Sequence, residues 1–433
     1  MPACPQSSRP PTLVWRVAGE TRRPRAVGQD ALPGPGEGDG LLSSAHGWSY
    51  VQDEPGLRQG IMKQLPTLEP GDKPRKATWY TLTCPGDRPC PRVGHSCSYF
   101  PPLGEAESGK VFIVGGANPN QSFSDVHTMD LGTQQWDTAT KEGLLPRYEH
   151  ASFLPTCSPH SIWVFGGADQ SGNRNCLQVM SPEARTWSTP EVTGSPPSPR
   201  TFHTSSAAIG NQLYVFGGGE RGAQPVQDVK LHVFDANTLK WSQPETHGSP
   251  PSPRHGHVMV AAGTKLFIHG GLAGDKFFDD LHCIDIGDMS WQKLGPTGAA
   301  PVGCAAHAAV AVGHHVYMFG GMTATGALNT MYKYHTEKQH WTILQFDTSL
   351  PPGRLDHSMC VIPWQVTPTS ENEDSDSVIL TLQAEKGDAA EKAGTQSGGP
   401  HEESPTTMLL CFVFGGMNTE GEIYDDCLVT VVD

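Results

Sequence analysis

The segment YVFGGGERG, from Tyr214 to Gly222, ends an apolar strand in a run of glycines. These glycines satisfy the GxGxxG pattern, with which dinucleotide-binding folds lay a pyrophosphate on the N-terminus of a helix. The residues that follow, AQPVQDVKLHVFDANT, alternate polar and apolar side chains and include Pro225. They predict strands and turns, and no amphipathic helix that could receive a phosphate. The pattern therefore does not indicate a dinucleotide site.

The unit of an apolar strand and a glycine pair recurs along the chain. Its copies are VFIVGG, IWVFGG, YVFGG, LFIHGG, VYMFGG and CFVFGG, which end at Gly116, Gly167, Gly218, Gly271, Gly321 and Gly416. The intervals between these ends are 51, 51, 53, 50 and 95 residues. A unit of about 50 residues with four short strands cannot close its own core, so neighbouring units must cover one another's faces. The spacing predicts a propeller.

Two other features recur in phase with the glycines. A tryptophan follows each of the first five pairs, at Trp136, Trp187, Trp241, Trp291 and Trp341. An Arg-x-x-His motif precedes the first strand of a copy, as Arg92/His95, Arg147/His150, Arg200/His203, Arg254/His257 and Arg354/His357. In the fifth copy Cys304 replaces the arginine and His307 remains. We expect the tryptophans to be scaffold residues that cover the adjacent sheet.

The repeat resembles the Kelch repeat from residue 75 to residue 433, apart from one insertion. The resemblance implies an all-β, six-bladed Kelch β-propeller. The composition agrees, since 49 glycines, 38 prolines and only 17% charged residues favour many short strands over long helices.

The two ends of the chain predict how the ring closes. The last copy stops at Asp433, directly after its third strand, and so lacks the strand that carries a tryptophan. The segment ATWYTLTC, with Trp79, has no strands of its own before it. We expect this N-terminal strand to complete the last blade and to remove both exposed edges, which makes residues 71–433 one propeller.

Two segments lie outside the repeat. Residues 1–70 contain Gly/Pro-rich stretches such as ALPGPGEGDG with little apolar content, and we expect a disordered N-terminal extension. Residues 365–407 account for the long last interval and hold nine acidic residues and two lysines. We expect them to form an acidic, disordered insertion within the last blade.

The net charge and the hydropathy of the chain argue against several classes of function. A formal net charge of -15 opposes binding to a polyphosphate backbone, so we expect no nucleic-acid partner. There is no run of eighteen apolar residues and no secretory signal, which predicts a cytoplasmic protein. The 11 cysteines form no CxxC pair, and most lie in apolar runs, as expected for buried, reduced thiols.

No motif for catalysis is present, so we predict a protein that is not an enzyme, with no catalytic residue, no cofactor and no metal. The repeated Arg-x-x-His motifs could ring the central channel, but a repeated set is more typical of side chains that satisfy carbonyls at strand ends between blades than of a metal site. The pairs Asp279/Asp280 and Asp425/Asp426 are expected to bond turn amides. An enzyme or a small-molecule-binding protein that uses the central channel stays the alternative.

The loops after the glycine pairs differ from copy to copy, as binding loops on a rigid scaffold do. In the fourth copy, Phe277 and Phe278 beside Lys276 form a candidate partner anchor, with the alternative that one phenylalanine packs into the blade. Tyr148 is a second candidate. The arginines of the repeated motif could receive an acidic partner, which adds Arg92, Arg147, Arg200, Arg254 and Arg354.

Three longer stretches carry a narrower resemblance. They are MKQLPTLEPGDKPRKATWYTLTCPGDRPCPRVGHSCSY from Met62, GERGAQPVQDVKLHVFDANTLKW, and FGGMNTEGEIYDDCLVTVVD at the C-terminus. They resemble a family of Rab GTPase effectors built from Kelch motifs, from which residues 1–61 depart. The resemblance implies binding of a late-endosomal Rab in its GTP form, other trafficking proteins as partners, a peripheral location on late endosomes, and a role in the return of mannose-6-phosphate receptors to the trans-Golgi network.

Overall fold

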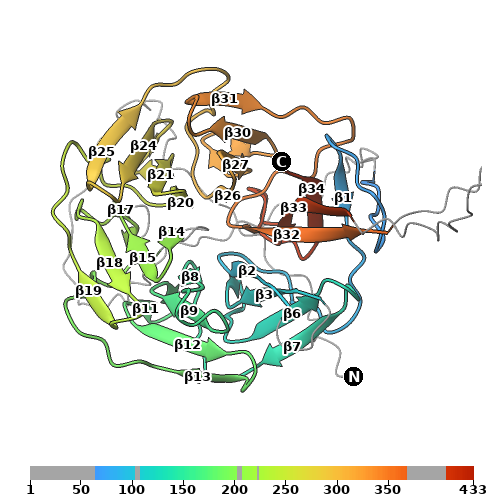
Figure 1. Cartoon of the computed structure of the whole chain (residues 1–433), viewed down its shortest axis with the longest axis horizontal. Helices are drawn as coiled ribbons and strands as arrows, with labels where there is room; N and C mark the ends of the chain where they lie inside the picture. The colour runs from blue at the N-terminus through green and yellow to red at the C-terminus, as the bar shows by residue number, and fades with distance from the viewer. Residues whose placement is uncertain (1–63, 103–107, 202–206, 222–223, 368–405) are drawn as a thin grey trace, which may run out of the picture.

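The computed structural model describes residues 64–102, 108–201, 207–221, 224–367 and 406–433. These residues form six four-stranded antiparallel sheets, which stand one after another around a common axis (Figure 1). We number the sheets blades 1 to 6 in chain order. The arrangement confirms the prediction of an all-β, six-bladed propeller.

In blades 1 to 5 the strands follow chain order from the axis to the rim (Figure 1). Blade 1 contains β2 (Ser96–Phe100), β3 (Lys110–Val114), β6 (Val126–Asp130) and β7 (Trp136–Thr140). Blade 2 contains β8 (Ala151–Phe153), β9 (Ile162–Phe165), β12 (Leu177–Ser181) and β13 (Thr186–Ser188). Blade 3 contains β14 (Ala207–Ile209), β15 (Gln212–Val215), β18 (His232–Asp235) and β19 (Lys240–Ser242). Blade 4 contains β20 (Val258–Ala262), β21 (Lys265–His269), β24 (Leu281–Asp285) and β25 (Ser290–Leu294). Blade 5 contains β26 (Ala308–Val312), β27 (His315–Phe319), β30 (Met331–His335) and β31 (His340–Ile343).

Blade 6 joins the two ends of the chain. It contains β32 (Ser358–Val366), β33 (Thr406–Phe414), β34 (Cys427–Val431) and, at the rim, β1 (Trp79–Thr81). Trp79 lies opposite Thr430 in the β1–β34 ladder, and Tyr80 lies opposite Val429. The predicted closure by the N-terminal strand is therefore confirmed.

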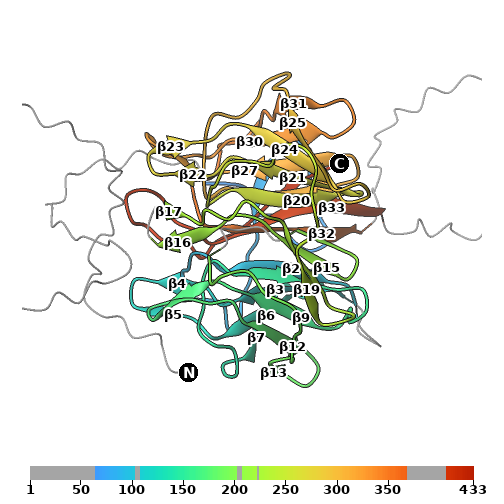
Figure 2. The ribbon, with the colours of Figure 1, turned by 90° about the vertical axis from the view of Figure 1, so that its left-hand side faces the viewer.

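A two-stranded hairpin follows the glycine pair in each of the first five blades. The hairpins are β4 (Ala117–Asn118) with β5 (Gln121–Ser122), β10 (Ala168–Asp169) with β11 (Gly172–Asn173), β16 (Gly219–Arg221) with β17 (Gln224–Pro225), β22 (Leu272–Ala273) with β23 (Lys276–Phe277), and β28 (Met322–Thr323) with β29 (Gly326–Ala327). Figure 2 shows the labelled hairpins along one face of the propeller. We call this side the hairpin face.

Each rim tryptophan covers the residue that precedes the glycine pair of the preceding blade. The ring centroids are 5.6 Å apart for Trp136 and Phe414, 4.7 Å for Trp241 and Phe165, 5.3 Å for Trp291 and Phe216, 5.4 Å for Trp341 and His269, and 4.8 Å for Trp79 and Phe319. Trp187 packs likewise against the cluster that contains Val114. The tryptophans thus join neighbouring blades, as the sequence predicted.

A repeated backbone hydrogen bond also joins the blades. The second glycine of each pair donates its N–H to the carbonyl of the residue that opens the Arg-x-x-His motif of the next blade, at 2.8 to 3.1 Å. Gly271 donates in this way to Cys304, so the bond survives where the arginine is replaced. Gly416 donates to Arg92 and closes the ring. This backbone hydrogen bond therefore positions the first residue of the motif independently of its side chain.

Near the axis, the third residues of the motifs bond to one another. The N–H of Gly94 donates to Asp356, that of Asp356 to Ala306, and that of Ala306 to Gly256, at 2.7 to 3.0 Å. Ala306 and Asp356 have φ values of 57° and 51°, a left-handed conformation that few non-glycine residues adopt. These innermost backbone groups of blades 1, 4, 5 and 6 are thus paired between blades.

The boundaries of the two non-repeat segments differ from the prediction. Leu68 is only 2% exposed, and its N–H donates to Thr81 while Thr81 donates to Pro66. The expectation of disorder up to residue 70 is therefore wrong for residues 64–70, which pack on blade 6; residues 1–63 lie outside the described residues. In the predicted insertion, Gln365 and Thr407 face each other in the β32–β33 ladder, so the hairpin is longer than expected, while residues 368–405 are not described.

In the described part of the chain, no helix has the length and apolar content that crossing a bilayer requires.

Candidate functional site

The five arginines of the repeated motif are at most 1% exposed. In each, Nη1 donates to the carbonyl of the first glycine of the same blade, at 2.8 to 3.1 Å. The sequence predicted that these arginines satisfy strand-end carbonyls between blades. They do bond carbonyls at strand ends, but within their own blade, so the inter-blade part of the prediction is wrong for the arginines. Whether Arg92, Arg147, Arg200, Arg254 and Arg354 contact a partner stays a prediction, and their burial weighs against it.

A carboxylate neutralises four of these arginines. The ion pairs are Arg92–Asp125, Arg200–Asp228, Arg254–Asp280 and Arg354–Asp426, with N–O distances of 2.6 to 3.4 Å. In blade 2, Arg147 instead donates to Oε1 of Gln178 at 2.6 Å. Asp280 and Asp426 therefore bond buried guanidinium groups, and the expectation that they bond turn amides is wrong. A buried cation needs such a partner, which a sequence alone does not point out.

Burial and hydrogen bonding determine the charge states of the aspartates and histidines around these arginines. Burial would raise the pKa of Asp280, but hydrogen bonds from His282 and Arg254 hold it well below its usual range. Burial lowers the pKa of His95 and His150 to about 3, and that of His269 to about 4. These imidazoles are neutral at pH 7. Nε2 of His95 accordingly bonds the carbonyl of Phe414 in blade 6, at 3.1 Å.

The candidate anchors of the fourth copy separate in the structure. Phe278 is 7% exposed and stacks under the guanidinium of Arg254, whose Cζ lies 4.0 Å from the ring centroid. Phe277 is half-buried, and Lys276 is exposed at the start of β23, directly after the turn of the β22–β23 hairpin. The alternative that one phenylalanine packs into the blade holds for Phe278. Phe277 and Lys276 remain available at the hairpin face.

Phe277 lies beside an apolar cluster that spans blades 5 and 6. The cluster consists of buried Ala306, Met322, Leu355 and Met417, with Val93, Phe277, Ala327 and Ile423 packed around it. Tyr148 belongs to the same face, because its N–H donates to Ala168 at the start of the β10–β11 hairpin. Tyr148 is half-buried, and burial raises the pKa of its phenol. The hairpin face thus combines partly buried aromatic residues with exposed loop residues.

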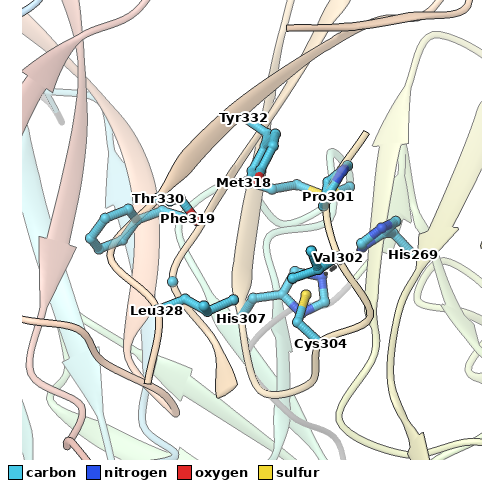
Figure 3. Close-up of a pocket in the computed structure, with 11 residues that line it drawn as sticks. His269, Pro301, Val302, Cys304, His307, Met318, Phe319, Leu328, Thr330 and Tyr332 are labelled. Atoms are coloured by element: carbon cyan, nitrogen blue, oxygen red, sulfur yellow. Dashed lines mark hydrogen bonds between the residues drawn. The ribbon is translucent and has the colours of Figure 1, made fainter. Parts of the chain in front are cut away.

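The fifth copy contains a group of side chains that the sequence prediction of no metal did not consider. His269, Cys304 and His307 are all buried, and their ligand atoms lie within 4.8 Å of one another. Figure 3 shows His269 reaching from blade 4 toward His307 and Cys304, which precede blade 5. Cys304 stands at the position of the motif arginine in the other copies. His269 stands directly before its glycine pair, where four other copies have a phenylalanine. Two departures in adjacent copies were the signal available in the sequence.

Comparison with known proteins places the chain in a family. A model of the KLHDC2/KLHL20/DRC7 Kelch-repeats domain matches residues 73–208 and 155–367. The chain is 94% identical to the "Rab9 effector protein with kelch motifs" of Mus musculus over 378 residues, which cover 87% of this chain and all of that protein. It is 80% identical to the Homo sapiens protein of that name over 372 residues, 86% of this chain and all of the relative. The Gallus gallus protein is 53% identical over 373 residues, 85% of this chain and 99% of the relative.

Proposed function

The chain belongs to the family of Rab9 effector proteins with kelch motifs, and we propose that it acts as an effector that binds a Rab GTPase in its GTP form. One observation carries the proposal: the chain covers relatives of this name over their whole length, from 94% identity in mouse to 46% in zebrafish. The shared length includes all six blades, so it supports the same scaffold with the same binding role.

Selectivity for the GTP form follows from the chemistry of the partner. The γ-phosphate and its Mg²⁺ order the switch loops of a GTPase, and hydrolysis releases them. A rigid propeller surface fits an ordered loop better than a mobile one, because the mobile loop loses more conformational entropy on binding. The structure supplies such a rigid surface through the hydrogen bonds that join its blades.

We assign the docking site to the hairpin face near blade 4. Lys276 and half-buried Phe277 follow one another in β23, at the edge of the apolar cluster around Met322, Leu355 and Met417. An aromatic side chain with a charged neighbour at its rim is the usual composition of an interaction hot spot. Tyr148 supplies a second aromatic group on the same face.

We propose that the protein is not an enzyme. The channel-based alternative needs reactive side chains at the axis, whereas the motif arginines are ion-paired or hydrogen-bonded within their own blades. Among the described residues, innermost backbone groups of blades 1, 4, 5 and 6 bond to one another. These contacts support a scaffold. We further propose that the protein is cytoplasmic and reaches late endosomes through its Rab, where with other trafficking proteins it promotes receptor return to the trans-Golgi network.

The test of binding uses the full chain and purified Rab9 immobilised with a non-hydrolysable GTP analogue or with GDP. We expect capture of the chain by the GTP-analogue form and at least about tenfold less by the GDP form. A panel of other Rab GTPases measures selectivity. Equal capture by both nucleotide states, or no capture by either, would contradict the effector proposal.

The test of the site compares two charge reversals on exposed lysines. Lys276→Glu changes the hairpin face, while Lys338→Glu changes the β30–β31 turn at the opposite end of the strands. We expect Lys276→Glu and Phe277→Ala to weaken Rab capture, because a hot-spot residue contributes about 2 kcal/mol or more, and Lys338→Glu to leave it unchanged. Full binding by both hairpin variants would reject this face while leaving the effector proposal intact.

A further inference from the structure

We propose that His269, Cys304 and His307 bind one soft metal ion, Cu(I), between blades 4 and 5. The proposal does not rest on Rab binding, because the three side chains are buried between sheets. The site adjoins the hairpin of blade 4, since the N–H of Cys304 donates to the carbonyl of Phe278 at 3.2 Å.

The site exists because the repeat is broken twice at one place. In the other blades an arginine opens the motif, and four of those arginines pair with an aspartate at the start of the third strand. In blade 5 the corresponding residues are Cys304 and Thr330, and both line one small cavity. The cavity measures about 10 Å³, which is the volume that a single water or ion needs. It lies where the other blades place a guanidinium group.

The second departure brings a ligand from the preceding blade. His269 occupies the position that Phe165, Phe216, Phe319 and Phe414 hold in other copies, against the rim tryptophan of the next blade. Nδ1 of His269 lies 3.2 Å from Nε2 of His307. Nε2 of His269 is buried and has no hydrogen-bond partner among the described residues. A phenylalanine would leave no such polar atom inside the seam, so a buried histidine is costly at this position unless one of its nitrogens gains a partner such as an ion.

The distances fit a shared ion. With metal–nitrogen bonds near 2.05 Å and a metal–sulfur bond near 2.3 Å, ligand atoms on one ion lie about 3.3 to 3.6 Å apart. Nδ1 of His269 lies 3.2 Å from Nε2 of His307, and Sγ of Cys304 lies 3.7 Å from Nδ1 of His307. A histidine gives one ion only one of its nitrogens, so a single set of ligand atoms is bounded by the larger separation of 4.8 Å. Since all three ligand atoms lie within 4.8 Å, no separation needs to close by more than about 1.2 Å.

Charge and softness favour Cu(I). The residues that line the cavity include no carboxylate, so a single thiolate is the only anion available among them. A monovalent ion with one thiolate and two neutral imidazoles is neutral, whereas Zn²⁺ would leave a positive charge buried in an apolar seam. The thioether of Met318 also lines the cavity, and thiolates and thioethers select Cu(I). On binding, the thiol proton leaves to solvent and copper keeps its oxidation state.

The ion has a route of entry. Val302, which lines the cavity, is 56% exposed and lies two residues before Cys304 in the connector between blades 4 and 5. A carrier or small chelate could therefore deliver copper from the connector side without opening the blades.

The test titrates full-length, reduced protein with Cu(I) under anaerobic conditions, in competition with the chromogenic chelator bicinchoninate. All variants carry Cys97→Ser, because Sγ of Cys97 lies 3.1 Å from Sγ of Cys360 and this thiol pair could bind copper elsewhere. We expect one Cu(I) per chain in this background, and a roughly 100-fold or greater loss of affinity in Cys304→Ser and in His269→Phe. His269→Phe restores the residue of the other copies, so it is the variant most compatible with folding.

A matched control replaces Cys283, a buried thiol in β24 of blade 4, by serine. Copper affinity should not change in this variant, and the metal-free melting temperature reports any damage to the fold. X-ray absorption of the copper-loaded protein should show nitrogen and sulfur neighbours, with the nitrogen signal reduced in His269→Phe. Unchanged copper binding in both site variants, or sulfur neighbours alone, would overturn the proposal. Zn²⁺ bound in place of Cu(I), and lost in the same variants, would overturn the copper assignment.

Discussion

The indole ring of Trp79 lies 4.8 Å, centroid to centroid, from the phenyl ring of Phe319, and so joins the first strand of the propeller to blade 5. Trp79 is fully buried, and its strand at the same time supplies the rim of blade 6 through the ladder with Thr430. A single N-terminal residue therefore connects two blades and removes the exposed edge of β34. We therefore expect this contact to contribute to the closure of the ring, together with the β1–β34 ladder and the hydrogen bond from Gly416 to Arg92.

Trp79→Ala should destabilise the propeller by about 3 to 5 kcal/mol, because it removes a large buried side chain at the seam. Chemical denaturation followed by tryptophan fluorescence and circular dichroism measures the change. Trp187→Ala is the matched control, since Trp187 is half-exposed on the rim of blade 2 and should cost clearly less. Equal losses in the two variants would contradict a special role for the N-terminal strand.

Arg254→Met should destabilise the protein by about 3 kcal/mol, because it removes the buried cation that pairs with Asp280 and donates to the carbonyl of Gly270, and leaves Asp280 with the hydrogen bond from His282. Lys265→Met in the same blade is the control, since Lys265 is exposed at the start of β21 and should change stability by less than about 0.5 kcal/mol. Urea titrations of the two variants make the comparison. A near-neutral Arg254→Met would show that the ion pair is dispensable to the fold.

Periodicity explains why so much of the fold could be predicted. The glycine pairs, rim tryptophans and Arg-x-x-His motifs recur at one spacing because each blade solves the same packing problem, and the missing strand of the last copy pointed to Trp79. The partner of each arginine could not be predicted in this way. Asp280 and Asp426 begin third strands, where turn bonding is equally reasonable, and only the three-dimensional register brings them to a guanidinium.

The candidate site was harder to predict for the same reason. Phe277 and Phe278 are adjacent in sequence, and the direction of a two-residue strand decides which one is buried. His269 and Cys304 belong to different copies of the repeat. Their proximity could be predicted only from the contact between successive blades, which a comparison of positions within one copy does not show. Two residues that depart from the repeat, such as His269 and Cys304, indicate a shared site only when the structure of the repeat shows that their positions lie in contact.

Stability should fall on acidification from pH 7 to pH 5. Burial lowers the pKa of His95 and His150 to about 3, whereas an unfolded histidine titrates near 6.5. Below pH 6.5 these histidines bind protons in the unfolded chain but stay neutral in the folded chain. The stabilisation present at neutral pH is therefore lost as the pH falls toward 3. At pH 5 each such histidine should cost about 2 kcal/mol.

Urea titrations at pH 7 and at pH 5 test this pH dependence. His95→Gln keeps a polar side chain that does not titrate. In this variant the loss of unfolding free energy between pH 7 and pH 5 should be smaller by the contribution of one histidine. A wild-type stability that is the same at both pH values would contradict the buried neutral state of these imidazoles.

Gly416→Ala should destabilise the ring far more than Gly313→Ala, although both glycines have positive φ values, 88° and 54°. A Cβ on Gly416 would lie 2.7 Å from the carbonyl oxygen of Leu355 and from Cβ of His357, while one on Gly313 meets nothing within 4 Å. Gly313→Ala should therefore cost only the conformational term of about 1 to 2 kcal/mol. Gly416→Ala adds a backbone clash at the point where its N–H donates to Arg92, so thermal denaturation should show a clearly larger loss. Equal losses would mean that the seam can open enough to accept a methyl group, and that close backbone approach does not explain the glycine pairs.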